Sequence, residues 1–138
     1  MSSSAVLDVW ESIADGAAAE SQLWAETLRP EAEQERDPAV YEELERRGAR
    51  LEAGLGEYGR VRRVGAMLTL FMTDGGIRNF EDVQRCNTER YGALFRHLLG
   101  RGIYVAPSQF EAMFISLAHG DEEIDRTVEA VGEFFRGA

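Results

Sequence analysis

The fold of this chain is decided by one apolar stretch, Val61-Arg-Arg-Val-Gly-Ala-Met-Leu-Thr-Leu-Phe-Met-Thr73. Apart from its two arginines, the stretch consists of small, apolar or β-prone residues, and glycines lie on both sides of it. A short apolar run bounded by turn residues is typical of a buried strand. We therefore predict a buried strand over residues 61–73, followed by a turn at Asp74-Gly75-Gly76.

Helical patterns surround this strand. Asp37 followed by Pro38 is typical of a helix start, and apolar residues recur at helical spacing as far as Leu55. A long helix is expected from Asn79, which caps it, to Leu99, and its apolar stripe includes Cys86. A last helix is expected after Asp121, with Asp121 as its cap.

Two shorter strands are expected at residues 102–106 and 113–118, paired like a hairpin around a Pro-Ser-Gln-Phe-Glu-Ala loop. The order of elements predicts an α+β domain in which a small antiparallel sheet is covered by helices. Residues 1–36 differ in pattern, and we interpret them as a helical leader of unknown role. The predicted domains are therefore 1–36 and 37–138.

The charge balance excludes several classes of partner. The 138 residues include 25 acidic and 15 basic ones, which gives a net charge of −10. We expect neither nucleic acid nor a membrane as partner, because both present negative charge. No signal peptide or long apolar span is recognisable, so we expect a cytoplasmic protein.

Two residue counts limit the chemistry. All 15 basic residues are arginine, so no side-chain amine is available for a Schiff base. Cys86 is the one cysteine, and the two histidines lie far apart, so we expect no disulfide and no metal site. Cys86 is interpreted as a packing residue, and His119 as a residue bonded to backbone near a helix start.

The loop between the two short strands carries the best candidates for a functional site. Glu111 lies beside Phe110 and near Ser108, where a carboxylate can contact a substrate or act as a general base. From the residues alone we favour the alternative in which Glu111 is solvated and Phe110 belongs to the core, because no second acid–base group accompanies Glu111. Three arginines, Arg60, Arg62 and Arg63, either pair with an acidic partner surface or, as we prefer, balance the acidic helix before them.

A resemblance changes the weight given to Glu111. The chain resembles the C-terminal part of the glutamate-1-semialdehyde 2,1-aminomutases, class-III aminotransferases of fold type I, from about residue 37 to its end. Tyr-Val-Ala-Pro-Ser-Gln-Phe-Glu-Ala at residues 104–112 is its most specific segment. The other matching segments are Arg63-Val-Gly-Ala-Met-Leu-Thr-Leu-Phe-Met-Thr-Asp74 and Ser116-Leu-Ala-His-Gly-Asp-Glu-Glu-Ile-Asp-Arg-Thr127.

The resemblance implies a pyridoxal-phosphate enzyme that converts glutamate 1-semialdehyde into 5-aminolevulinate, the precursor of tetrapyrroles. In that family a large domain holds the cofactor through a lysine, and a small C-terminal domain closes over the site. The glutamate of the Ser-Gln-Phe-Glu motif approaches the substrate, which here implies Glu111 as the substrate contact, with weaker roles for Ser108 and Gln109. A carboxylate in that place would repel substrates that carry an additional carboxylate.

The chain departs from the family pattern in two ways that bear on function. It has no lysine, so we expect no covalently bound cofactor and no catalysis by this chain alone. Met113 stands where the family usually has glycine, which adds bulk next to Glu111. Two alternatives remain for its partner: a separately encoded cofactor domain, or self-association as a non-catalytic interaction or dimerisation module.

Overall fold

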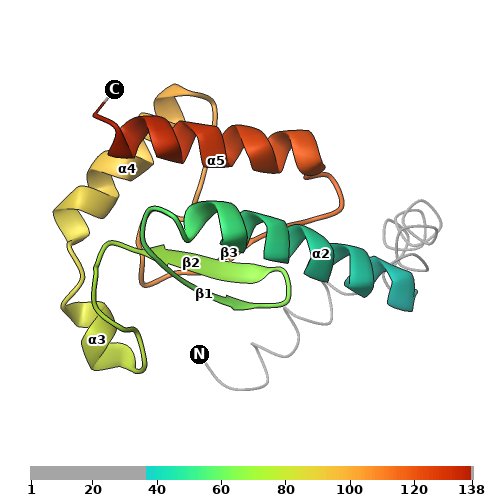
Figure 1. Cartoon of the computed structure of the whole chain (residues 1–138), viewed down its shortest axis with the longest axis horizontal. Helices are drawn as coiled ribbons and strands as arrows, with labels where there is room; N and C mark the ends of the chain where they lie inside the picture. The colour runs from blue at the N-terminus through green and yellow to red at the C-terminus, as the bar shows by residue number, and fades with distance from the viewer. Residues whose placement is uncertain (1–36, 138) are drawn as a thin grey trace, which may run out of the picture. The chain divides into compact units, whose positions relative to one another are not determined.

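The computed structural model describes residues 37–137 (Figure 1). The predicted helical leader at residues 1–36 lies outside this range. The elements in chain order are helix α2 (Pro38–Leu55), strands β1 (Arg60–Val64) and β2 (Met67–Phe71), helices α3 (Phe80–Gln84) and α4 (Thr88–Gly100), strand β3 (Met113–Phe114) and helix α5 (Asp121–Phe135). The predicted α+β class is confirmed, with an antiparallel sheet in the order β1-β2-β3.

The apolar stretch that decides the fold forms a hairpin, so the prediction of one strand over residues 61–73 is wrong. β1 pairs with β2 from Arg60↔Phe71 to Val64↔Met67. Gly65 occupies the turn with a φ of 58°. Glycine adopts a positive φ readily because it has no Cβ, and the chain therefore reverses where we expected it to continue.

The predicted pairing of residues 102–106 with residues 113–118 is also wrong. β3 is limited to Met113–Phe114, and it pairs with β2 through Met67↔Phe114 and Leu68↔Met113. Because β1 and β3 occupy the two edges of β2, residues 102–106 find no free edge there and form no strand.

The predicted long helix from Asn79 to Leu99 is two helices. Asn79 does cap a helix, since its side chain accepts from the Asp82 N–H, but α3 ends at Gln84. A second asparagine, Asn87, accepts from the Arg90 N–H and starts α4. Two N-caps eight residues apart favour two short helices over one.

The predicted cap of the last helix is off by one residue. Gly120 is the N-cap of α5 and makes no side-chain cap bond, while Asp121 is the first helical residue. Asp121 and the two glutamates after it place negative charge in the first turn, which stabilises the positive end of the helix dipole.

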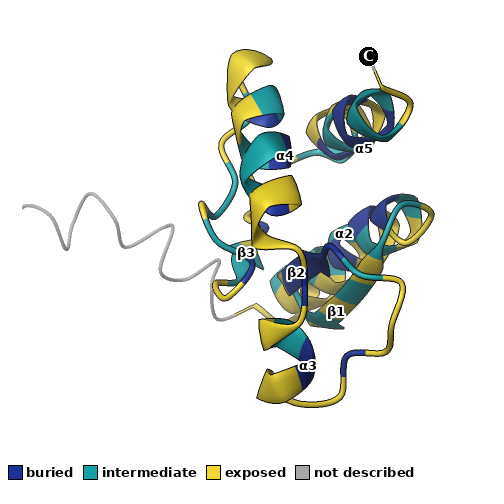
Figure 2. Ribbon diagram, turned by 90° about the vertical axis from the view of Figure 1, so that its left-hand side faces the viewer, coloured by how far each residue is buried: buried dark blue, intermediate teal, exposed yellow. Residues whose placement is uncertain are grey.

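The main core lies between one face of the sheet and helices α2, α4 and α5 (Figure 2). Each element contributes aliphatic residues to it: Leu51 and Leu55 from α2, Leu68 and Leu70 from β2, Leu94 and Leu98 from α4, and Ile124 and Val131 from α5. Leu99, on the apolar stripe at the end of the predicted long helix, is instead 50% exposed. A smaller cluster of Phe71, Ile77 and Cys86 connects the opposite side of β2 to α3.

Candidate functional site

The loop at residues 107–112 is fixed to the sheet and to α4 by side-chain hydrogen bonds at both its ends. The Tyr91 hydroxyl donates to the carbonyl oxygen of Ala106 at 2.7 Å. The Thr69 hydroxyl donates to the carbonyl oxygen of Glu111 at 3.1 Å. A rigid element on either side therefore positions the loop that carries the candidate residues.

Gln109 lies inside this loop, with 2% of its surface exposed. Its Oε1 accepts a hydrogen bond from the Met72 N–H at 3.1 Å. Its Nε2 has no hydrogen-bond partner among the described residues. The buried Gln109 side chain thus anchors the loop to the end of β2. Its role is to position the loop.

Ser108 forms the turn of the loop. Its Oγ accepts from the Phe110 N–H at 3.1 Å, and its carbonyl oxygen accepts from the Glu111 N–H at 3.1 Å. Phe110 is half exposed and lies 6.0 Å from the Phe80 ring, centroid to centroid. The expectation that Phe110 belongs to the core is therefore wrong.

Glu111 is exposed and lines a cavity of about 530 Å³. This volume is within the range of small-molecule sites. The other ionisable and hydroxyl-bearing residues of its lining are Tyr104, His119, Glu123, Arg126 and Thr127, and Met113 lines it close to Glu111. The structure thus brings Glu111 to a cavity, while Ser108 and Gln109 serve the loop that presents it.

The pKa of Tyr91 depends on the charge of Glu111. Burial raises the pKa of Tyr91 to about 12, and the negative charge of Glu111 adds to that increase. In the sequence, Tyr91 lies on the apolar stripe of the predicted helix from Asn79 to Leu99. Its role as an anchor of the loop was missed, because a tyrosine on the apolar stripe of a helix gives no signal of the carbonyl that its hydroxyl contacts.

Two other residues have the structural roles that we predicted. The His119 Nδ1 accepts from the Ser116 N–H at 3.0 Å. Cys86 is buried, its Sγ donates to the Asp82 carbonyl oxygen at 3.4 Å, and burial raises the pKa of the thiol. A raised thiol pKa disfavours the reactive thiolate.

The three arginines near the hairpin belong to the domain's own structure. Arg63 forms ion pairs with Glu45 and Glu52 of α2, as the preferred interpretation predicted. Arg60 and Arg62 instead donate to the backbone carbonyls of Asp74 and Ile77.

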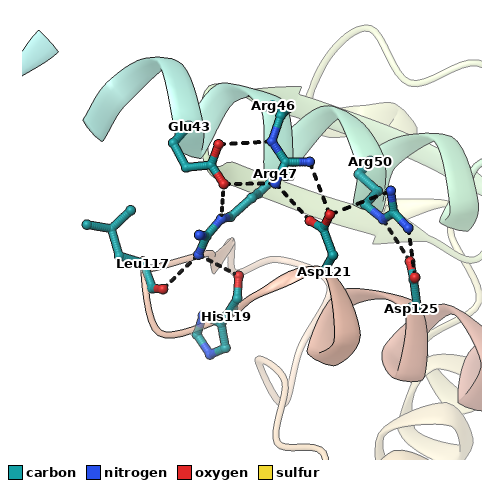
Figure 3. A network of polar contacts seen from close by, with 8 residues as sticks. All are labelled: Glu43, Arg46, Arg47, Arg50, Leu117, His119, Asp121 and Asp125. Carbon is teal, nitrogen blue, oxygen red and sulfur yellow. Dashed lines mark hydrogen bonds and ion pairs between the residues drawn. The ribbon is translucent and has the colours of Figure 1, made fainter. Parts of the chain in front are cut away.

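An ion-pair network that the sequence did not reveal connects α2 to α5 (Figure 3). Arg46 contacts Glu43 and Asp121, each at 2.8 Å, and Arg50 contacts Asp125 at 2.7 Å. Hydrogen bonds lower the pKa of Glu43 to about 2, the largest effect coming from Arg46 and the next from Arg47. The partners are up to 75 residues apart, so only the fold brings them together.

The Arg47 guanidinium extends this network to the segment before α5. Its Nη1 donates to the carbonyl oxygens of Leu117 and His119, at 2.7 Å and 2.9 Å (Figure 3). The segment that follows β3 is therefore held to α2, and His119 is held at the border of the cavity.

The residues present do not fit a resident pyridoxal phosphate. The chain contains no lysine to bond the cofactor. The cavity beside Glu111 presents two carboxylates, Glu111 and Glu123, and one guanidinium, Arg126, which already donates to the Arg101 carbonyl oxygen. A net negative lining is unsuited to a phosphate group.

Residues 37–137 hold no cluster of three or more His, Cys, Asp or Glu side chains able to bind a metal ion. Over the same range, no helix has both the length and the apolar character that crossing a membrane requires.

Comparison with known proteins relates the chain to one enzyme family. The glutamate-1-semialdehyde 2,1-aminomutase of Acetivibrio thermocellus is 44% identical over 101 residues, which are 72% of this chain and 24% of that protein. A corresponding protein of Thermus thermophilus is 46% identical over 106 residues, and that of Sorangium cellulosum is 47% identical over 103 residues. This chain spans about a quarter of the length of these relatives. No protein-family model matches it.

Solved structures agree with this relationship. A β-phenylalanine aminotransferase from Variovorax paradoxus superimposes with a TM-score of 0.57 at 31% identity, over 72% of this chain and 23% of that one. An omega-transaminase from Sphaerobacter thermophilus has a TM-score of 0.60 at 20% identity, over 75% and 25%, and so shares the fold. Over about 72% of its length, this chain is therefore a homologue of the C-terminal portion of the glutamate-1-semialdehyde 2,1-aminomutases, within the class-III aminotransferase family.

Proposed function

We propose that this chain supplies the C-terminal small domain of a pyridoxal-phosphate-dependent glutamate-1-semialdehyde 2,1-aminomutase, in the synthesis of 5-aminolevulinate for tetrapyrroles. The observation that carries this proposal is the 44–47% identity to aminomutases over 70–72% of this chain. The proposed domain works with the remaining three-quarters of such an enzyme, which carries the cofactor.

In this proposal Glu111 contacts the substrate. The loop that bears it is anchored at Ala106, Gln109 and the Glu111 carbonyl, so the backbone that carries its carboxylate has a defined place. The negative charge of Glu111 repels a substrate that carries an additional carboxylate. It would therefore discriminate against amino donors such as glutamate. That selection suits an enzyme that rearranges one substrate and must not accept a second one.

The chain is proposed to be inactive alone, since it lacks the lysine that binds the cofactor. The alternative is a non-catalytic interaction or dimerisation module derived from the same domain. Val64, Met67 and Phe114 of the sheet are exposed, and exposed apolar residues frequently mark interfaces. This exposure favours the interaction module. Light scattering separates the two: a dimer at micromolar concentration favours the module, and a monomer favours the enzyme domain.

A chimera tests the proposed function directly. The matching quarter of the Thermus thermophilus aminomutase is replaced by residues 37–138, and 5-aminolevulinate formation is measured. We expect activity in the chimera, and a folded, cofactor-loaded chimera without activity would contradict the proposal. Glu111→Gln in the chimera should increase amino transfer from glutamate by roughly tenfold, about 1.4 kcal/mol. Glu122→Gln, an exposed charge on α5, is the matched control and should change nothing.

A further inference from the structure

The two histidines of the chain use their rings in opposite ways. The Nε2 of His97 lies 2.9 Å from the carbonyl oxygen of Ala130. A carbonyl oxygen only accepts, so this Nε2 carries a proton and donates it. The Nδ1 of His119 lies 3.0 Å from the backbone nitrogen of Ser116. A backbone N–H only donates, so the Nδ1 of His119 is an acceptor without a proton, and the neutral ring carries its proton on Nε2.

Protonation of the ring changes only one of these two contacts. An imidazolium has an N–H on both nitrogens, so His97 keeps its donor to Ala130 in either state. His119 loses its acceptor, because the new proton occupies the lone pair that the Ser116 N–H uses. Histidine is the side chain whose charge ordinarily changes between about pH 5 and pH 8. The contact of His119 is therefore sensitive to pH, and that of His97 is not.

The contact of His119 closes a turn at residues 116–119, which we call the histidine turn. The His119 N–H donates to the Ser116 carbonyl oxygen at 3.1 Å. The Ser116 Oγ accepts from the Ala118 N–H at 3.2 Å and lies 3.2 Å from the His119 Nδ1. This hydroxyl can donate to a neutral ring or accept from a protonated one, but the Ser116 N–H cannot reverse its role. Acid therefore removes the bond to the Ser116 N–H and changes how the ring is held.

Arg47 holds the backbone of the histidine turn independently of the ring. Its guanidinium donates to the carbonyl oxygens of Leu117 and His119, and the ring itself points away from α2 (Figure 3). Arg47 also pairs with Glu43, the other charged group of α2 at this place. These bonds do not use the imidazole, so they remain when His119 is protonated. The change is thus confined to the ring and to the Ser116 N–H.

The ring of His119 belongs to a residue that lines the cavity beside Glu111. The other charged residues of this lining are Glu111, Glu123 and Arg126, two carboxylates and one guanidinium, which give a net charge of −1. Tyr104 contributes a phenol, which is uncharged between about pH 5 and pH 8. Asp121, at the start of α5, is paired with Arg46. A protonated His119 therefore cancels the net charge of the lining.

We infer that His119 is a pH-dependent switch at the border of the cavity that contains Glu111. In its neutral form the ring is held by the Ser116 N–H, and the cavity lining is negative. In its protonated form the ring gives up that bond and adds a positive charge, so the cavity no longer presents a net negative charge to a ligand. The switch depends on this chain's own residues and does not rest on the proposed function.

Nuclear magnetic resonance of the isotopically labelled full chain tests this inference between about pH 8 and pH 5. At the upper end, the spectrum of the His119 ring should place its proton on Nε2. As His119 is protonated, the amide proton resonance of Ser116 should move upfield with the same midpoint, because its hydrogen bond is lost. The Nε2–H of His97 should remain bonded to Ala130 throughout, which makes His97 the internal control.

Two substitutions separate the acceptor from the ring. His119→Asn places a carbonyl oxygen close to the position of Nδ1 and does not titrate, so the Ser116 resonance should stop responding to pH. His119→Ala has no acceptor, so that resonance should lie upfield at every pH. His97→Gln is the matched control and should leave the response of Ser116 as it is in the wild type.

Three results would overturn the inference. One is a Ser116 resonance that stays in place while His119 is protonated. Another is a ring proton on Nδ1 of His119 at the upper end of the pH range. The third is a response of Ser116 that persists in His119→Asn, since another group would then be titrating. A response that disappears in His119→Asn and persists in His97→Gln supports the switch, whether or not the chimera is active.

Discussion

The Gln109 side chain accepts a 3.1 Å hydrogen bond from the backbone N–H of Met72, and both residues are buried. This bond joins the loop of the candidate site to the residue that follows β2. A buried N–H that loses its acceptor destabilises a protein by about 1–3 kcal/mol. The loop is therefore part of the domain's stability as well as of its candidate site.

Gln109→Ala should lower the free energy of unfolding by about 1–3 kcal/mol, because the Met72 N–H is left without an acceptor. For a domain of this size that corresponds to a Tm lower by roughly 4–8 °C per kcal/mol. Gln84→Ala, at an exposed position of α3, is the control and should change stability by less than about 0.5 kcal/mol. Equal Tm values for the two variants would show that the bond does not hold the loop.

The ion-pair network between α2 and α5 predicts a loss of stability in acid. Arg46 and Arg47 lower the pKa of Glu43 from 4.5 to about 2, and Arg46 lowers that of Asp121. A carboxylate whose pKa is depressed in the folded state stabilises it above the unfolded pKa, and this contribution disappears as the group is protonated. Thermal unfolding should therefore show a Tm that falls as pH decreases from about 4.5 to about 2.

Arg46→Gln should weaken this dependence of Tm on pH, because both carboxylates then titrate closer to their ordinary values. Arg96→Gln, an exposed arginine of α4, is the matched control and should leave the dependence as it is. Added salt should reduce the difference between the wild type and Arg46→Gln, since exposed charges are screened. The network would be irrelevant to stability if the two variants gave the same pH profile.

The position of Glu111 can be measured through Tyr91. Burial and the Glu111 charge raise the pKa of Tyr91 to about 12. Glu111→Gln removes the charge and not the burial, so the pKa of Tyr91 should fall part of the way towards 10. Ultraviolet absorbance of tyrosinate follows this titration, and Tyr91→Phe identifies which transition belongs to it. An unchanged Tyr91 transition in Glu111→Gln would place the carboxylate elsewhere.

The same pKa predicts how stability changes in alkali. A tyrosine whose folded pKa lies above its unfolded value of about 10 stabilises the fold at lower pH, and that stability is lost as pH rises towards about 12. Tyr91→Phe should remove this part of the pH dependence. It should also lower Tm at neutral pH, because the Ala106 carbonyl loses its 2.7 Å donor.

The absence of lysine makes a chemical prediction. The chain mixed with pyridoxal phosphate and treated with borohydride should carry no reduced adduct on any side chain. Peptide mass mapping is the measurement, with an intact Thermus thermophilus aminomutase as the positive control. A stoichiometric adduct on a side chain of this chain would contradict the proposal that another part of the enzyme binds the cofactor.

The sequence predicted the fold class and three helix starts because those features depend on local patterns. Asp37-Pro38, Asn79 and the acidic turn at Asp121 are each readable from neighbouring residues. The hairpin at Gly65 was missed because an apolar run with one glycine has the same pattern as a continuous strand. Strand pairing could not be predicted, because whether residues 102–106 or Met113–Phe114 take the free edge of β2 depends on contacts distant in sequence.

The candidate site also has one residue that the sequence identified and others whose roles only the structure shows. Glu111 was identified through resemblance to a family motif, and the fold exposes it at a cavity. Tyr91 and Thr69, which hold its loop, are indistinguishable in sequence from ordinary core positions. Their roles appear only where the hydroxyls meet the carbonyl oxygens of Ala106 and Glu111.

The most direct test of the account is to measure 5-aminolevulinate formation by the isolated chain and by the Thermus chimera under the same conditions. The account predicts turnover by the chimera and none by residues 1–138 alone, with or without added pyridoxal phosphate. Conversion of glutamate 1-semialdehyde by the isolated chain at an enzymatic rate would contradict it.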